Sequence, residues 1–282
     1  MSALLLDVQG VSKRFGGVQA LNDVSLQVHT GQVYGLIGPN GAGKTTFFNV
    51  ITGLVPPDSG RFELGGRAYK PSAVHRVAQA GIARTFQNIR LFGQMTALEN
   101  VMVGRHVRTR SGLLGAVLRT PGFKREEAQT VERAKGLLEL VGLVNQAAQA
   151  AHTLSYGDQR RLEIARALAT EPKLIALDEP AAGMNATEKL QLRTLIEAIR
   201  DQGKTVLIIE HDVKLVMGLC DRVTVLDQGQ RIAEGTPAEI QRNQQVIEAY
   251  LGSAHQPFEA EHEGPIGDPL VGDDAPNPEP AP

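Results

Sequence analysis

The sequence lacks the features that mark secreted or membrane-spanning proteins. Its 282 residues include one cysteine, Cys220, which cannot form an internal disulfide. No apolar run approaches the length of about 18 residues that a membrane-spanning helix needs. The start, "MSALLLDVQG", has neither a basic segment nor the long apolar run of a signal peptide. These absences predict a soluble chain in a reducing compartment.

Basic residues are missing from the C-terminal segment. From Ala254 onward there are seven acidic residues, seven of the fifteen prolines, and no lysine or arginine. This composition predicts a disordered acidic tail over residues 254–282. The preceding body keeps 29 basic and 24 acidic residues, a mild excess that does not require a nucleic acid partner.

Short apolar runs alternate with helical segments in the body, residues 4–252. Residues 32–38, 173–179 and 205–211 are compact apolar runs, typical of strands buried on both faces. An amphipathic helical pattern over residues 189–201 separates the last two. This order predicts an α/β core with a parallel sheet, and the alternating pattern of the first 70 residues adds antiparallel strands.

The middle of the body, about residues 90–168, has a different pattern. Thr96 and Glu99 have the spacing of a capping box, and residues 124–143 and 158–169 are strongly helical. No strand pattern interrupts them, so we expect a helical subdomain inserted into the core. The sheet then resumes with a hairpin around residues 227–230, and Thr236 opens a further helix.

The segment "GPNGAGKTT" matches the phosphate-loop pattern and lies between an expected strand and an expected helix. Glycines let backbone N–H groups surround phosphates at a helix N-terminus. Lys44 is expected to reach the β- and γ-phosphates of ATP, and Thr45 to ligate Mg²⁺. The predicted nucleotide-binding residues of this loop are Gly38, Pro39, Asn40, Gly41, Ala42, Gly43, Lys44, Thr45 and Thr46.

Three charged or titratable residues lie at the ends of the next two expected strands. Asp178 ends the run "LIALD" and is a candidate Mg²⁺ ligand, while Glu179 beside it is a candidate base for an attacking water. His211 ends the run "LIIEH", at the sheet edge where the γ-phosphate should lie.

In this order the phosphate loop, "LSYGDQ" (154–159), "LIALDE" and His211 resemble the ATPase subunit of an ATP-binding-cassette (ABC) transporter over residues 4–252. The resemblance implies that Phe15 stacks on adenine. It also implies that Gln87 senses Mg²⁺ and the γ-phosphate at the hinge to the helical subdomain, and passes this state to a membrane partner. Gln87 thereby joins the expected catalytic and metal residues.

The resemblance also explains a second phosphate-binding pattern at Ser155 and Gly157. Subunits of this family pair head to tail, and each ATP lies between one chain's phosphate loop and the other chain's signature segment. Ser155 and Gly157 are therefore expected to bind, in trans, a nucleotide held by a second ATPase subunit.

Departures from the usual signature narrow the resemblance to one branch. Tyr156 and Asp158 replace Gly and Gln of the common Leu-Ser-Gly-Gly-Gln, and Asn185 replaces a common aspartate. With "RTFQNIRLF" and "LDEPAAGMN", they resemble the ATPases of branched-chain amino acid importers. This branch implies two permease subunits, a periplasmic solute-binding protein, and a peripheral place on the cytoplasmic face of the membrane.

Several alternatives stay open at this point. Related ATPases import urea or short amides, and a lipopolysaccharide exporter shares part of the pattern. A soluble ABC ATPase acting on ribosomes or DNA is an alternative of another class, although tandem cassettes and long coiled coils are absent. A small-molecule kinase would not explain "LSYGDQ".

Overall fold

The computed structural model of the protein describes residues 2–108 and 120–252. The acidic tail predicted for residues 254–282 lies outside them. The strands are β1 (Leu4–Phe15), β2 (Val18–His29), β3 (Val33–Ile37), β4 (Ser59–Leu64), β5 (Arg67–Ala68), β6 (Ile82–Arg84), β7 (Leu174–Asp178), β8 (Thr205–Ile209), β9 (Arg222–Asp227) and β10 (Gln230–Gly235). The helices are α1 (Lys44–Ile51), α2 (Val74–Ala80), α3 (Ala97–Arg105), α5 (Pro121–Leu140), α6 (Tyr156–Leu168), α7 (Ala186–Asp201), α8 (Val213–Leu219), α9 (Pro237–Gln241) and α10 (Gln244–Gly252).

The central sheet has the strand order β10-β9-β3-β8-β7-β6, and only its β9–β10 pair is antiparallel. Because β3, β7 and β8 are parallel neighbours, their carboxyl ends lie at one edge of the sheet. The expected strands over 32–38, 173–179 and 205–211 are therefore confirmed, and so is their parallel pairing. The chain segments that follow these strands form the candidate site.

Alternate residues of the central strands enter two separate cores. In β8, Val206 and Ile208 pack on the face shared with α7 and α8, whereas Leu207 and Ile209 pack with α1 and the N-terminal strands. The strands β3, β7 and β8 are buried at every position. Burial on both faces explains why their sequences are continuous apolar runs instead of alternating ones.

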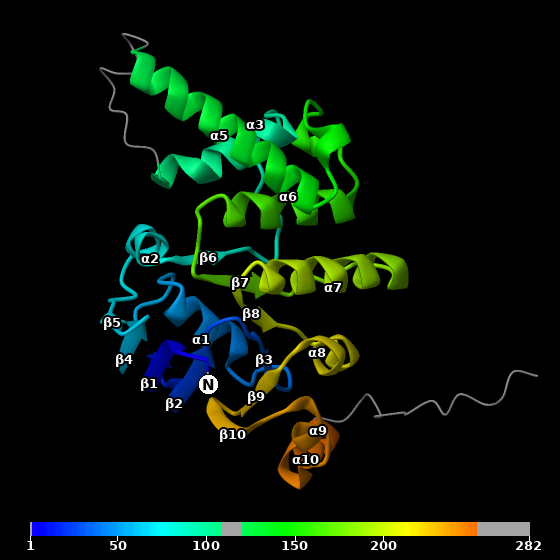
Figure 1. Ribbon diagram of the computed structural model, residues 1–282. Coiled ribbons are helices and arrows are strands. Elements are labelled where there is room, and N and C mark those ends of the chain that lie inside the picture. The colour runs from blue at the N-terminus through cyan, green and yellow to red at the C-terminus, as the bar shows by residue number, and fades with distance from the viewer. Residues whose placement is uncertain (1, 109–119, 253–282) are drawn as a thin grey trace, which may run out of the picture.

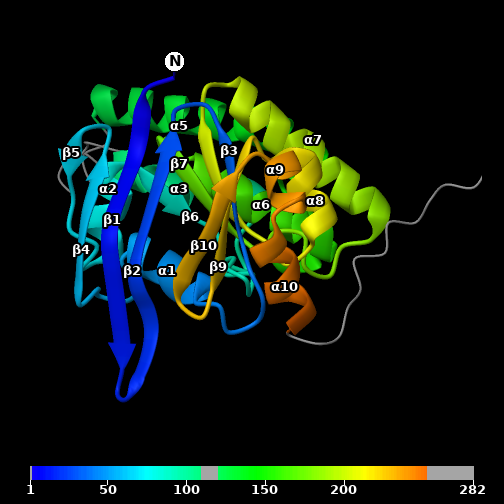
Figure 2. The ribbon, with the colours of Figure 1, turned by 90° about the horizontal axis from the view of Figure 1, so that it is seen from below.

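The N-terminal strands form a second sheet, antiparallel, with the order β2-β1-β4-β5. Figure 2 shows β1 and β2 as a long hairpin that lies beside β9 and β10. This arrangement agrees with the mixed α/β fold expected from the sequence. The hairpin of β9 and β10 is also confirmed, and its turn residues Gln228 and Gly229 have positive φ angles of 46° and 77°.

Residues 90–108 and 120–168 of the described chain contain helices and no strand, apart from an isolated bridge between Thr96 and Ala150. We call α3, α5 and α6 the helical lobe; Figure 1 shows it at the top of the molecule, beyond α7 and the sheet. The predicted capping box of Thr96 and Glu99 opens α3. Thr120 caps α5, which begins at Pro121, three residues before the expected helical run.

Close packing of α3 on α6 holds the helical lobe together. Gly104 is buried where the two helices meet, and a Cβ atom there would lie 2.3 Å from the carbonyl oxygen of Arg166. Only glycine allows the backbones to approach this closely. Gly136, on the exposed side of α5, has no neighbouring atom within 4 Å of such a Cβ.

We therefore expect Gly104→Ala to lower the free energy of unfolding by about 1–3 kcal/mol, because the added methyl forces α3 away from α6. The matched variant Gly136→Ala should leave it unchanged or raise it by about 0.5–1 kcal/mol, since alanine favours a helix interior. Urea denaturation measures both. Equal effects of the two substitutions would contradict this account of the helix contact.

Candidate nucleotide site

The phosphate loop links β3 to α1 and depends on glycine at three positions. Gly38, Gly41 and Gly43 have φ angles of 148°, 81° and 96°, which L side chains rarely adopt. A Cβ atom at Gly38 would lie 2.1 Å from the carbonyl oxygen of Leu226, and one at Gly43 would lie 2.7 Å from that of Ala20. The loop thus presents its backbone to a ligand at the N-terminus of α1, a geometry that suits a phosphate.

Lys44 is buried beneath this loop. Its Nζ atom donates to the carbonyl oxygens of Gly38 at 2.6 Å and Pro39 at 2.9 Å. Burial lowers the pKa of Lys44, and the negative charge of Glu179 opposes that shift. The ammonium group therefore lies inside the loop, close to the carboxylate that follows β7.

Glu179 has a backbone conformation that is unusual for a residue other than glycine. Its φ angle is 44°, and its N–H donates to the carbonyl oxygen of Ile209 at 2.9 Å, which ties the end of β7 to β8. Strained non-glycine residues concentrate at functional sites, because the surrounding structure must enforce them. The carboxylate of Glu179 is thereby directed to the edge of the sheet.

Three residues that sequence reasoning selected as catalytic converge there. Gln87 donates through Nε2 to Oε2 of Glu179 at 2.7 Å. Nδ1 of His211, which follows β8, lies 3.8 Å from the same oxygen. The side chain of His211 is 61% exposed, so it is open to a ligand at this edge. Residues from two other segments of the chain thus approach the carboxylate of Glu179.

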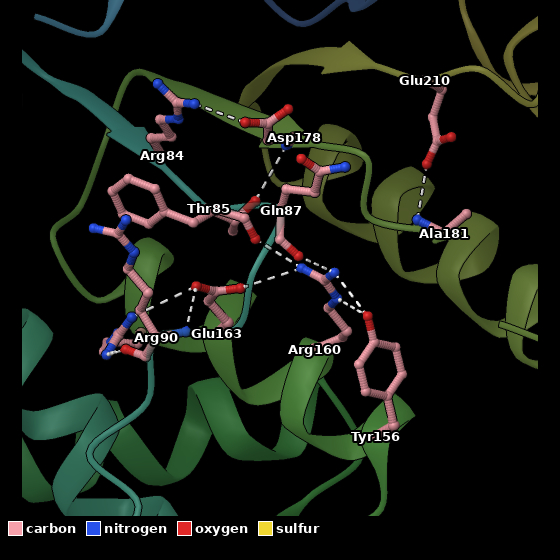
Figure 3. A network of polar contacts seen from close by, with 12 residues as sticks. Arg84, Thr85, Gln87, Arg90, Tyr156, Arg160, Glu163, Asp178, Ala181 and Glu210 are labelled. Carbon is pink, nitrogen blue, oxygen red and sulfur yellow. Dashed lines mark hydrogen bonds and ion pairs between the residues drawn. The ribbon is translucent and has the colours of Figure 1, made fainter. Parts of the chain in front are cut away.

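Asp178 ends β7 and is nearly buried. Its Oδ2 accepts from Arg84 at 2.6 Å, and its N–H donates to the hydroxyl of Thr85 (Figure 3). Among the described residues, no hydrogen bond or ion pair is made by its Oδ1. This free oxygen, the exposed Thr45 hydroxyl and the amide oxygen of Gln87 are hard donors of the kind Mg²⁺ prefers. The donor set fits that ion.

Ser155 and Gly157 lie in the helical lobe, at the start of α6. Ser155 caps this helix, because its hydroxyl accepts from the N–H of Asp158. Gly157 is buried against α7, and a Cβ atom there would lie 2.8 Å from Oε1 of Glu188. Figure 1 shows α6 and α1 in different parts of the molecule. No hydrogen bond or ion pair within the described chain joins residues 155–157 to residues 38–46.

The two unusual polar residues near this segment have structural partners. Asp158 forms an ion pair with Arg161, one turn further along α6, so its negative charge is compensated locally. Asn185 opens α7 with a capping box, in which its side chain accepts from the N–H of Glu188 and the carboxylate of Glu188 accepts in return. Neither residue leaves an uncompensated charge beside Ser155.

Phe15 lies at the end of β1, on the rim of the N-terminal sheet. It is 49% exposed, and Nζ of Lys13 lies 5.4 Å from the centre of its ring. A core position is therefore excluded, and about half of the Phe15 surface is accessible to a ligand.

Sequence reasoning missed several buried charged residues around the site. Arg84 pairs with Asp178, and Arg160 and Glu163 lie in α6 below Gln87 (Figure 3). Glu210, before His211, accepts from the N–H groups of Ala181 and His211, which ties the segment after Glu179 to the end of β8. Burial raises the pKa of Glu210. In the sequence, these residues could have been recognised only as charged residues that stand inside an apolar run or on a helical face.

Comparison with known proteins agrees with this geometry. The family model described as "ABC transporter" matches residues 21–182, which span the phosphate loop and Glu179. The chain belongs to the ABC transporter family. Membership implies nucleotide binding and ATP hydrolysis. A second model, "Branched-chain amino acid ATP-binding cassette transporter", matches residues 230–256 at the C-terminal end of the fold.

Individual relatives cover almost the whole chain. It is 48% identical over 255 residues to the "High-affinity branched-chain amino acid transport ATP-binding protein LivG" of Salmonella typhimurium, with 90% of this chain and 100% of that protein covered. It is 35% identical to the "Lipopolysaccharide export system ATP-binding protein LptB" of Escherichia coli over 247 residues, 88% and 97% of the two chains. A crystal structure of an ATP-binding cassette of an ABC transporter in its ADP conformation aligns with a TM-score of 0.78 at 34% identity, covering 89% and 100%.

Proposed function

We propose that this chain is the ATP-hydrolysing subunit of a membrane importer for branched-chain amino acids. The observation that carries the proposal is the convergence of Gln87, Glu179 and His211 at the sheet edge beside Lys44. This arrangement combines a phosphate-binding loop that carries a buried lysine with a carboxylate on a strained backbone position.

Different residues of this chain have separate roles in ATP hydrolysis. The phosphate loop and Lys44 hold the β- and γ-phosphates, while Glu179 accepts a proton from the attacking water. Gln87 orients that water through its contact with Glu179, and His211 donates toward the γ-phosphate. Thr45, Asp178 and Gln87 are the residues that would hold Mg²⁺, which supplies charge neutralisation on the phosphate oxygens when bound.

The cargo is inferred from relatives, because the described nucleotide site contains no solute-binding feature. Relatives that are named as branched-chain amino acid transport proteins reach 46–48% identity, whereas the lipopolysaccharide export proteins reach 35–39%. The separate match of residues 230–256 to the branched-chain family supports the same choice. An importer of urea or short amides is the second candidate, since its ATPase would share the sequence pattern of this branch.

Transport requires membrane-embedded partners. No helix within residues 2–108 and 120–252 is long and apolar enough to cross a membrane. From the transport systems named for its relatives, we infer that two permease subunits carry the solute, with a periplasmic binding protein delivering it, and that the chain acts at the cytoplasmic face. Solved cassettes related to this chain include one described as dimeric, with a TM-score of 0.70 at 25% identity. By this similarity, we infer that a second ATPase subunit pairs with this chain.

A cavity of about 340 Å³ offers a docking surface for a permease. It lies between α2 and the helical lobe, and five partly exposed apolar side chains surround it: Leu54, Val74, Phe92, Val103 and Val107. Its lining includes Phe86, which precedes Gln87. We name it the lobe groove and assign it to an apolar segment of the permease, because a segment bound there would contact the chain next to the catalytic glutamine.

The assignment of Glu179 as the base predicts the behaviour of Glu179→Gln. The variant should lose about 10²–10⁴-fold in kcat for ATP hydrolysis, because the amide cannot accept the proton from water. ATP affinity should be retained, since Lys44 and the loop are unchanged. Phosphate release and equilibrium binding of ATP measure the two properties separately. Hydrolysis within threefold of the unmodified chain would refute the assignment.

The lobe groove predicts that a charge placed among its apolar side chains weakens permease binding. Val103→Asp should reduce co-purification with the permeases by at least tenfold, because burying an unpaired carboxylate is unfavourable. Val144→Asp is the matched control: Val144 is 49% exposed and lies outside the groove, in the short turn after α5. Equal loss in both variants, or loss in neither, would contradict the docking assignment.

A further inference from the structure

Tyr156, in the signature segment, contacts Arg160 one turn further along α6 and Gly183 in a segment that is distant in sequence. Its hydroxyl accepts from Nη2 of Arg160 at 2.8 Å and from Nε at 3.2 Å. Its ring packs on Gly183, where a Cβ atom would lie 3.3 Å from the ring carbon Cε1. Gly183 belongs to the segment that follows Glu179. A glycine at position 156, as in the common signature, would make neither contact.

Arg160 is buried, with 4% of its side chain exposed, and all of its donors have partners. Nη1 donates to the carbonyl oxygen of Phe86 at 2.7 Å and lies 3.7 Å from the carboxylate of Glu163. Nη2 donates to the carbonyl oxygen of Gln87 as well as to Tyr156. The fixed fork geometry of the guanidinium group allows these contacts together, whereas the single ammonium group of a lysine does not.

These hydrogen bonds fix the backbone of Gln87 on the side that faces α6. Because two adjacent carbonyl groups bind one rigid cation, the peptide plane between Phe86 and Gln87 has little freedom to rotate. The side chain of Gln87 leaves this fixed backbone and meets Glu179 at 2.7 Å. Figure 3 shows Arg160 lying between Tyr156 and the backbone of Gln87.

Glu163, whose Oε2 lies 3.7 Å from Nη1 of Arg160, has further partners on the lobe side. Oε1 of Glu163 accepts from the N–H of Arg90, and Arg166 lies 3.7 Å away. Burial raises the pKa of Glu163, and the surrounding N–H groups and arginines oppose that shift. Glu163 and Arg166 also line the lobe groove. Arg160 is thus connected both to the groove and to the signature segment.

We propose that Arg160 is a positioning residue for Gln87, and that the hydroxyl of Tyr156 keeps the guanidinium group of Arg160 in place. The inference rests on the proposed function, in which Gln87 orients the attacking water on Glu179. It also gives the signature segment a second role. A phosphate of another chain that binds between Ser155 and Gly157 would act on Tyr156, and through Arg160 on this chain's own Gln87.

Three variants separate positioning from stability. Tyr156→Phe keeps the ring on Gly183 but removes the acceptor, and should lower kcat for ATP hydrolysis by about three- to tenfold. Arg160→Lys keeps the charge beside Glu163 but loses the fork, and should lower kcat by about ten- to a hundredfold. The double variant should be no slower than Arg160→Lys, because the tyrosine acts through the arginine. KM for ATP should change by less than about twofold, since Arg160 makes no contact with the phosphate loop.

Two control variants make the same kinds of substitution at positions of the described chain that do not contact Gln87. Tyr69→Phe deletes the hydroxyl that donates to the carbonyl oxygen of Ile51, and Arg193→Lys changes an exposed arginine paired with Glu197 on α7. Both should keep the kcat of the unmodified full-length chain. Rates are normalised to the number of nucleotide-binding sites and measured well below the unfolding midpoint, so that lost stability alone leaves kcat unchanged.

Unchanged kcat in Tyr156→Phe and Arg160→Lys would overturn the inference, as would additive losses in the double variant. If these variants are normal while Glu179→Gln is inactive, the positioning role fails and the proposed function stands. If Glu179→Gln itself hydrolyses ATP normally, the proposed function fails, and the role of Gln87 on which the inference depends fails with it.

Discussion

Two buried guanidinium groups hold the segment where the chain leaves the sheet for the helical lobe. Arg84, with 9% of its side chain exposed, pairs with Asp178 on the sheet side, while Arg160, with 4%, binds the carbonyl groups of Phe86 and Gln87 on the lobe side. A buried cation is strongly unfavourable without acceptors, and both Nη atoms of Arg84 and all three nitrogens of Arg160 have them, so these contacts constrain both parts of the chain. The position of Gln87 beside Glu179, and with it the proposed chemistry, depends on this constraint.

The contacts of Arg160 also give a structural role to the unusual signature segment. Tyr156 supplies an acceptor to Arg160 and a ring to the segment after Glu179, and Arg161 compensates Asp158. Tyr156 therefore connects the start of α6 to the segment after Glu179, whereas Asp158 is compensated within α6. In the proposed dimer, one chain's signature segment would meet the partner's nucleotide while remaining bonded to its own Gln87 backbone. That geometry offers a direct route by which the occupancy of one site affects the other.

The parts of the fold and the site that were predictable from sequence have local causes. The phosphate loop needs its glycines within nine residues, and the central strands are apolar throughout because both of their faces are buried. The buried charges could not be predicted in this way. Arg84 and Asp178 are 94 residues apart, and Arg160 and Phe86 are 74 apart, so only the folded chain shows that they meet. Glu179, at a positive φ angle, likewise has its hydrogen-bond partner Ile209 on another strand. Sequence patterns thus identify residues that act together with their neighbours along the chain. They do not identify residues whose partners are distant in sequence and come into contact only in the folded protein.

We infer that the phosphate loop and the signature segment of one chain serve two different nucleotides. ATP affinity and ATP-dependent association of cassette chains, measured together on Ser155→Arg in a Glu179→Gln background, test this inference most directly. ATP should still bind at the Lys44 loop with the affinity of the Glu179→Gln parent. Association in sedimentation velocity should be lost, because the arginine blocks the segment that meets the partner's phosphate. A loss of ATP affinity in the unassociated chain would contradict the inference, since Ser155 would then belong to the same site as Lys44.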